Sequence, residues 1–413
     1  MNDKVLKKFR RLLILWERYG NRILRLAVVL LATAAAFRLL HESFRLVLGD
    51  PQINGPNDLR NFQNAMKGLF AGQPIYRELH TSPYPPASYA IFWPLLGWLD
   101  LTQARLFWTA SVIAVLAWII VLIIRESKAN SPLERILVAL LLLSMNGTGV
   151  TIGNGQLGLH ILAALLTALV LIRQQNSSIL QQCLAALLLL LALAKPTISA
   201  PFIWMVMFAP HGKRILFLTG IGYLIVSWIA VSYQHEPAVS VFQSWFTRAS
   251  TVALEKGYGN LHALLSSVHL NQWMTPASLV VFGLLGFWVY LHRSVDSWLV
   301  IGVTAITARF WAYHRYYDDV LIILPMICLL RIAKASGSGN ARGWIAGTLL
   351  AMISFLNLAR LHNISALRFE LMTTANVTLW LLTIAFLLHL AKRENVETEL
   401  HLKSLSIVPK DAR

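Results

Sequence analysis

A single carboxylate in a polar loop is the first candidate for chemistry in this sequence. Asp58 lies in the turn-like stretch Gly55-Pro56-Asn57-Asp58, just after the first long apolar segment. A carboxylate held at a membrane surface can act as a general base, removing the proton from an attacking hydroxyl group. The turn leads into residues 59–70, where apolar side chains recur at helical spacing and predict an amphipathic surface helix. Asp58 could therefore also be the N-cap of that helix.

A second group of charged residues stands among aromatic ones near residue 315. It contains Arg309, His314, Arg315, Asp318 and Asp319. The cations could bind a phosphate group, and the two aspartates could orient them through charge-assisted hydrogen bonds. Ion pairing within the group is the alternative.

Lys195 ends a Leu/Ala-rich apolar segment, directly before Pro196, which breaks the helix. A lysine at membrane depth is costly unless it reaches the interface or meets an anion, so Lys195 could neutralise a lipid-linked phosphate or could simply snorkel. Tyr76 and Tyr84, in the same loop as Asp58, could stack on a sugar or anchor the chain to headgroups.

The composition is that of a polytopic membrane protein. Of the 413 residues, 56% are hydrophobic and only 13% are charged. The apolar runs are long and the connectors short, which predicts membrane-spanning helices and not strands. The net charge of +17 comes from brief clusters between apolar segments, so nucleic acid is not an expected partner. Cys183 and Cys328 both fall in apolar segments, which supports neither a disulfide nor a zinc site.

The distribution of Lys and Arg predicts an all-α bundle of about twelve transmembrane helices, with both termini in the cytoplasm. The basic residues 1–24 precede a transmembrane domain at 25–393, and residues 394–413 form a disordered cytoplasmic tail. Two outer loops are expected, at 48–101 and 233–275, the first containing a short re-entrant or interfacial segment at 87–99. The expected spans are 25–47, 102–124, 133–150, 155–172, 179–195, 198–210, 214–232, 276–292, 296–312, 318–333, 343–360 and 375–391.

The same topology puts five polar places on the outer side of the membrane, where they could converge on one site. They are the Asp58 loop, Gly153-Asn154-Gly155-Gln156, Lys195-Pro196-Thr197, residues 233–260 and residues 314–319. If 87–99 crossed the membrane completely, the last four would change sides relative to Asp58. Charged residues also occur within the first span and must face the bundle interior or mark an earlier exit; they are Arg38, His41, Glu42 and Arg45.

The ordered set of motifs resembles glycosyltransferase family 87 (DUF2029), a GT-C group of polyprenyl-phosphate-dependent enzymes that includes mannosyltransferases. The resemblance covers about residues 25–330. It rests on Asp58, Gly72-Gln73-Pro74-Ile75-Tyr76, Tyr84-Pro85-Pro86 with Pro94, Gly155-Gln156, Lys195-Pro196, and His314 with Tyr317-Asp318.

The resemblance implies transfer of a hexose, mannose-like, from a polyprenyl-phosphate sugar to an acceptor hydroxyl on a glycolipid or glycan. Asp58 would be the general base. Contacts with the donor phosphate would come from Lys195, His314, Arg315, Arg309, Gln156 and Asn154. Contacts with the sugar or acceptor would come from Tyr76, Tyr84, Asn260, Tyr317 and Asp318.

We expect no metal, because Asp318 and Asp319 are adjacent and point apart on a helix. No other cofactor is expected, because the lipid-linked sugar donor that the resemblance implies is itself a substrate. The expected location is the bacterial plasma membrane, with the site facing outward. The alternative function is a secondary transporter of an anionic or sugar-like solute. A transporter would predict two related halves, and the sequence shows no internal repeat.

Overall fold

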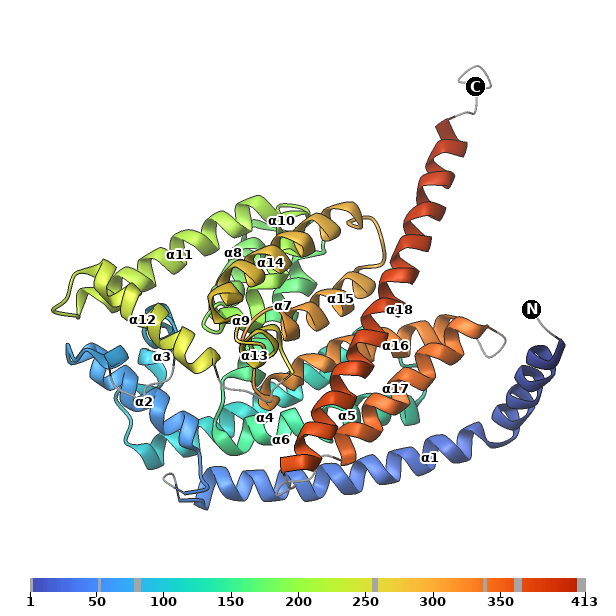
Figure 1. Cartoon of the computed structure of the whole chain (residues 1–413), viewed down its shortest axis with the longest axis horizontal. Coiled ribbons are helices and arrows are strands. Elements are labelled where there is room, and N and C mark those ends of the chain that lie inside the picture. The colour runs from blue at the N-terminus through green and yellow to red at the C-terminus, as the bar shows by residue number, and fades with distance from the viewer. Residues whose placement is uncertain are drawn as a thin grey trace.

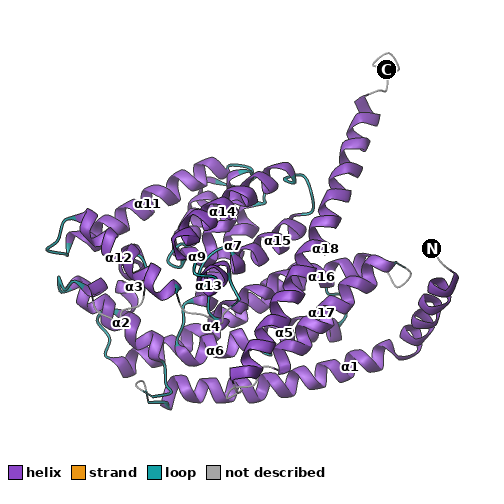
Figure 2. Cartoon of the chain, viewed as in Figure 1, coloured by secondary structure: helices purple, strands orange, loops and turns teal. Residues whose placement is uncertain are grey.

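The computed structural model describes residues 3–50, 53–77, 83–254, 259–336, 340–359 and 366–406, and every regular element in these ranges is helical (Figure 2). Long apolar runs form long helices, whereas Pro and Gly divide the segments between them. The elements of the first half are α1 (Asp3–Leu48), α2 (Asn57–Phe70), η1 (Ile75–Arg77), α3 (Pro86–Leu96), α4 (Leu101–Glu126), α5 (Pro132–Leu143), α6 (Asn146–Asn154), α7 (Gly158–Ile172), α8 (Ile179–Ala192), α9 (Pro196–Ser199) and η2 (Ala200–Phe202).

The second half has the same character, with short helices before the long ones. Its elements are α10 (Ile203–Met207), α11 (Gly212–Ser232), α12 (Ala238–Ala253), α13 (Leu261–Ser267), η3 (Asn271–Trp273), α14 (Met274–Leu291), α15 (Ser297–Phe310), η4 (Tyr316–Ile322), α16 (Ile323–Ser336), α17 (Ala341–Ala359) and α18 (Ala366–Ser406). In Figure 1, α1 runs along one side of the molecule, while α2, α3, α11 and α12 gather at the end far from the N-terminus.

Six helices in the described ranges are long and apolar enough to cross a membrane, or seven if the bent pair α5 and α6 forms one span. The chain is thus a multi-pass α-helical membrane protein, while the expected count of about twelve crossings stays a prediction. Four further apolar stretches are shorter, at 10–17 residues, and about 20 are normally needed. The six long helices are Arg18–Leu48, Leu101–Glu126, Gly212–Ser232, Asn271–Leu291, Ala341–Leu358 and Phe369–Glu394.

Three expected spans are broken into pieces. The expected span 133–150 bends by 51° between α5 and α6, 198–210 is divided among α9, η2 and α10, and 318–333 begins as η4. The C-terminal tail also differs from expectation. Helix α18 continues to Ser406, so the prediction of disorder was wrong for residues 394–406. Residues 407–413 lie outside the described residues.

An ion-pair network fastens one end of the bundle. The Arg173 guanidinium lies 2.8 Å from the Glu126 carboxylate, and the indole Nε1 of Trp298 donates to the same carboxylate at 3.0 Å. Arg331 donates to the Glu126 backbone carbonyl at 2.6 Å. Arg173 and Arg331 therefore meet at one end of the bundle through Glu126. The other end of α15 carries Arg309 and belongs to the candidate site.

Helix α6 is the element on which the candidate site is built. It packs against α1, α2 and η4. Its glycines allow these close approaches: a Cβ at Gly147 would lie 2.7 Å from the Val320 backbone nitrogen, and one at Gly153 would overlap the Glu42 carboxylate. The short, glycine-rich helix thus holds three distant parts of the chain together.

Candidate functional site

Asp58 lies in the first turn of α2, where the positive end of the helix dipole favours a carboxylate. The N-cap position belongs to Pro56, and no side chain caps the helix. The N-cap alternative for Asp58 is therefore wrong, because the helix begins at Asn57, two residues earlier than the apolar pattern indicates. Asp58 is half-buried.

Two side-chain amides from the end of α6 hold the Asp58 carboxylate, those of Asn154 and Gln156. They flank Gly155, which ends α6 in the left-handed conformation at φ 68°. A Cβ at Gly155 would lie only 2.5 Å from the Leu59 Cβ, so glycine also lets the end of α6 lie directly against α2. This contact places both amides beside Asp58.

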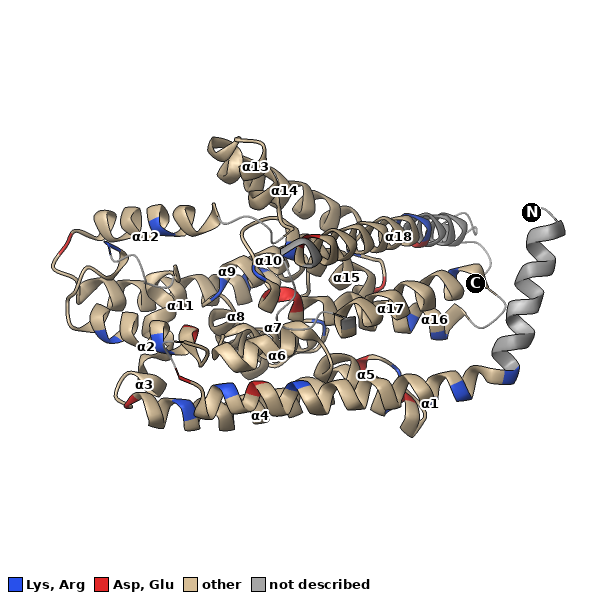
Figure 3. Cartoon of the chain, turned by 60° about the horizontal axis from the view of Figure 1, so that its bottom comes forward, with Lys and Arg blue, Asp and Glu red and all other residues tan. Residues whose placement is uncertain are grey.

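Lys195 is buried, and its Nζ lies 2.5 Å from an Asp318 carboxylate oxygen and 4.6 Å from the centre of the Tyr317 ring. The snorkelling alternative is wrong, because the ammonium group meets an anion inside the protein. The neighbouring Asp319 pairs instead with Arg309 at 2.6 Å. The two adjacent aspartates thus point to different cations, as their positions on one helix predict. Figure 3 shows red and blue positions close together near α9 and α15.

The 313–318 segment is fixed by its own hydrogen bonds. Arg315 donates its backbone N–H to Asp318 at 3.2 Å and its side-chain Nε–H to the Tyr313 hydroxyl. Asn260 donates its side-chain amide to the His314 carbonyl at 2.9 Å, while its oxygen accepts the backbone N–H of Ala263 at 2.9 Å. Both ends of the Asn260 amide are therefore used to hold α13 against this segment.

Two tyrosines between α2 and α3 lead to the same place. Tyr76 donates its hydroxyl to the Tyr84 carbonyl at 2.8 Å, and Tyr84 donates its own hydroxyl to Gln156 Oε1 at 2.8 Å. Both rings are buried, so neither anchors the chain to lipid headgroups. Asp58, Gln156 and Tyr84 form a continuous polar contact.

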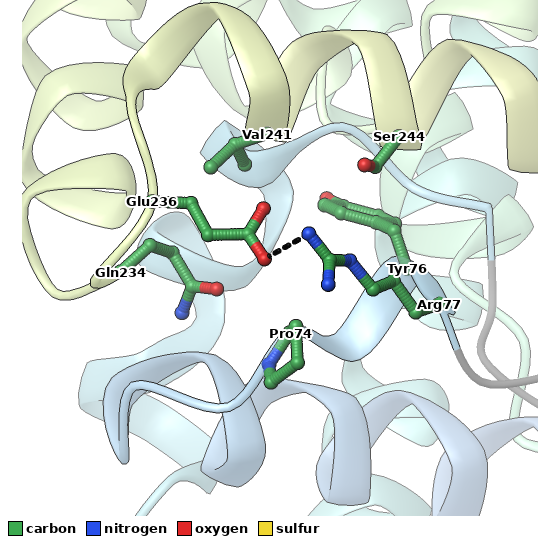
Figure 4. Close-up of a pocket in the computed structure, with 7 residues that line it drawn as sticks. All are labelled: Pro74, Tyr76, Arg77, Gln234, Glu236, Val241 and Ser244. Atoms are coloured by element: carbon green, nitrogen blue, oxygen red, sulfur yellow. Dashed lines mark ion pairs between the residues drawn. The ribbon is translucent and has the colours of Figure 1, made fainter.

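The segment between α2 and α3 and the segment from Gln234 to Trp245 pack on each other beside these tyrosines. Arg77 and Glu236 form an ion pair at 2.6 Å, and the Trp245 indole donates to the Pro83 carbonyl at 3.1 Å. A small pocket of about 10 Å³ lies at this contact, close to the least that holds one water molecule (Figure 4). Its lining residues are Pro74, Tyr76, Arg77, Gln234, Glu236, Val241 and Ser244.

Burial raises the pKa of Asp58 above its ordinary value of 3.8, and the opposing hydrogen bonds and the charges of Arg315 and Lys195 do not cancel this effect. Asp318 shows the opposite balance. Burial alone would raise the pKa of Asp318, but Lys195 and the other cationic groups around it lower the pKa below 3.8. Asp318 is thus held as a carboxylate, whereas Asp58 has an increased proton affinity, which suits a base.

His314 is fully buried, and burial lowers its pKa to about 4. The ring is therefore neutral at pH 7. Its Nδ1 lies 3.2 Å from the Ala312 carbonyl, so Nδ1 carries the hydrogen and Nε2 carries the lone pair. Nε2 has no hydrogen-bond partner in the part of the chain that the structure describes. Such a ring can accept a hydrogen bond from a hydroxyl group, but it supplies no positive charge to a phosphate.

Within the described ranges, no group of three or more His, Cys, Asp or Glu side chains could hold a metal ion. The side chains that do meet at the site are a carboxylate, amides, cations and tyrosines. A carboxylate can take a proton from a hydroxyl group, and cations can stabilise a developing anion.

The model of glycosyltransferase family 87 matches residues 83–333, which is more than half of the chain. The chain belongs to this family. As a family 87 glycosyltransferase it is an enzyme that acts on sugar substrates at a membrane, so the transporter alternative is set aside. The match includes Asn154, Gln156, Lys195 and His314, whereas Asp58 lies before it. Comparison with curated proteins finds no match, and comparison with solved structures finds none.

One contributor to the site was missed from the sequence. Arg45 of α1 donates to Asn154 Oδ1 at 2.9 Å and therefore touches a side chain that holds Asp58. The sequence carried a signal, because Glu42 and Arg45 are charged residues at the end of an apolar span. Their link to Asn154 depends on the packing of α1 against α6, which no local pattern encodes.

Proposed function

We propose that this enzyme transfers a mannose-like hexose from a polyprenyl-phosphate donor to an acceptor hydroxyl, with Asp58 as general base. The observation that carries the proposal is the half-buried Asp58 carboxylate, held by two amide groups. Its raised pKa increases its ability to take a proton, and the charges of Lys195 and Arg315 reach it. A base and an anion-binding group thus lie together in one site.

The chemistry is a single displacement. Asp58 takes the proton of the acceptor hydroxyl as its oxygen forms a bond to the anomeric carbon of the donor sugar. The bond from that carbon to the phosphate oxygen breaks, and its electron pair leaves with polyprenyl phosphate. Lys195 and Arg315 stabilise the charge that develops on the phosphate. The leaving group is already an anion, so the step needs no general acid.

The other predicted contacts follow from the same arrangement. His314, neutral and with an accepting Nε2, is suited to a sugar hydroxyl rather than to the phosphate. Tyr317 and Tyr84 would provide ring surface for a sugar. Arg309 would act on the phosphate from the side of Asp319, which holds its guanidinium in an ion pair. No metal or other cofactor enters the proposed step.

The proposed location is the plasma membrane of a bacterium, with the site outward and both termini in the cytoplasm. The bent pair of α5 and α6, the four shorter apolar stretches and α16 would bring the six long helices to about twelve crossings, and residues 87–99 would enter the membrane without crossing it. The contact between α12 and η1 supports a common side for the two outer loops. Charge distribution supports the orientation.

The test is turnover by the purified protein with a panel of polyprenyl-phosphate sugars and candidate acceptors. Asp58→Asn should abolish transfer, because an amide cannot take the proton, while Asp50→Asn, an exposed aspartate of the same loop, should retain it. Near-normal turnover by Asp58→Asn would remove Asp58 from the mechanism. Activity with nucleotide sugars in place of every lipid-linked donor would overturn the donor class.

A further inference from the structure

The outer end of α1 carries a buried charge pair that the proposed reaction does not use. Glu42 is only 1% exposed, and the Arg45 Nη1 lies 2.5 Å from its carboxylate. The other guanidinium nitrogens of Arg45 donate to Asn154 Oδ1 at 2.9 Å and to the Asn54 carbonyl at 2.8 Å. Arg45 therefore connects α1 to α6 and to the loop before α2.

The chemistry of these groups fixes which way the Asn154 amide points. Arginine only donates hydrogen bonds, so the Asn154 atom that meets Arg45 must be the oxygen. The amide nitrogen then faces the Asp58 carboxylate, with which Asn154 shares a hydrogen bond. If the amide were reversed, two oxygens would face each other at Asp58 and two donors at Arg45.

The second amide at Asp58 lacks this constraint. Gln156 receives its hydrogen bond from the Tyr84 hydroxyl, and a hydroxyl can donate or accept. Packing supports the Asn154 arrangement further, because a side chain at Gly153 would overlap the Glu42 carboxylate. The glycine at position 153 therefore leaves room for the Glu42–Arg45 pair next to Asn154.

We propose that Arg45, held by Glu42, is a positioning residue for the base: it orients the Asn154 amide so that the amide donates to Asp58. This inference rests on the proposed role of Asp58. Glu42 and Arg45, two charged residues within an apolar span, would thus act on the base through the Asn154 side chain. Neither of them would contact the substrate.

The consequence is measurable in the pH dependence of the reaction. Loss of one hydrogen bond to a carboxylate weakens its charged form, so the acid limb of kcat/KM should move upward by about one to two pH units. At pH values above the shifted limb, Asp58 is again ionised and most of the activity should return. The other titratable and charged groups that face Asp58 are Tyr84, Lys195, Arg315 and Tyr317.

The experiment compares Arg45→Met, Asn154→Ala and the double variant, using the donor and acceptor that the unaltered enzyme turns over. Each single change should shift the acid limb upward, and the double variant should shift it no further than Asn154→Ala alone. Arg105→Met is the matched control, because Arg105 donates to the Leu46 and Gly49 carbonyls at 2.7 Å and so fastens the same end of α1. It should leave the limb in place.

An unshifted limb in Arg45→Met, or shifts that add in the double variant, would overturn the proposal. Where Arg45→Met fails to accumulate because the buried Glu42 carboxylate loses the Arg45 guanidinium, Glu42→Gln with Arg45→Met removes both charges and is interpreted in the same way. Failure of the proposed function has a different result. In that case Asp58→Asn retains activity, and the unaltered enzyme has no acid limb that depends on Asp58.

Discussion

The Lys195–Asp318 pair can be separated into a structural part and a catalytic part by paired substitution. At 2.5 Å the two charges attract with about 7 kcal/mol for an effective dielectric constant of about 20. Much of this offsets the cost of removing both groups from water, whereas losing one partner leaves a buried charge and costs about 3–5 kcal/mol. Asp318→Asn and Lys195→Met should each lower the free energy of unfolding by amounts in this range.

The loss for Asp318→Asn should lie near the lower end, because Asp58 still lies near enough to lower the energy of the Lys195 charge. In the double variant no charge is left unpaired, so its loss should be smaller than the sum of the single losses by about 2 kcal/mol. The double variant should nevertheless remain inactive, since the proposed phosphate contact at Lys195 is gone.

The assay is chemical denaturation in detergent micelles, followed by the fluorescence of the 14 tryptophans. Because the folded-state pKa of Asp318 lies below its ordinary value of 3.8, the pair stabilises the protein above that pH. This contribution disappears as the pH falls through the lowered pKa, and the effect of Asp318→Asn should disappear with it. Purely additive losses, or full activity in the double variant, would refute this account of the pair.

Three further predictions concern the base, the end of α6 and the orientation in the membrane. Because the pKa of Asp58 is raised, its charge destabilises the fold at neutral pH. Asp58→Asn should therefore match or raise the thermal midpoint at pH 7, and the difference should shrink toward pH 4. A lower midpoint at pH 7 would contradict this. Gly155→Ala should lower the free energy of unfolding by about 1–2 kcal/mol because of its left-handed backbone alone, and by more because its Cβ would overlap α2. The control is Gly283→Ala, where a Cβ meets nothing within 4 Å, and it should lose no stability in the same denaturation assay. Ser250 and Asn176 are both exposed. In a chain without native cysteines, Ser250→Cys should react with an impermeant thiol reagent added from outside, and Asn176→Cys should not. The reverse pattern would invert the topology.

The long helices were predictable because each is an extended apolar run bounded by polar residues. Apolar segments such as 102–124 correspond closely to α4, since about 20 apolar residues have few other stable arrangements in a membrane. Shorter segments were less certain. The expected span 133–150 contains Gly147 and Gly149, and the structure bends it before them. Composition alone does not give the direction of such a bend.

For the candidate site, residue types and membrane side were enough to bring the correct segments together, but the individual partners were not predictable. The sequence suggested that Lys195 and the 309–319 group could converge, and the structure pairs Lys195 with Asp318. His314 was expected to act near the donor phosphate, yet its neutral ring follows from burial. Both facts depend on how helices distant in sequence pack against each other. The charge pattern of the sequence predicts only the side of the membrane on which each segment lies.

The position of α6 in the chain has a consequence for the order of assembly. Thr151 donates to the Tyr317 carbonyl at 3.0 Å across a separation of 166 residues, while the opposite side of α6 contacts α1. During synthesis α1 to α5 are complete long before η4 exists, so α6 gains its last neighbour late. Asp58 and the cations near it thus come together only when most of the chain has been made. An interrupted chain would carry Asp58 and Lys195 without Asp318, and so would lack a finished site.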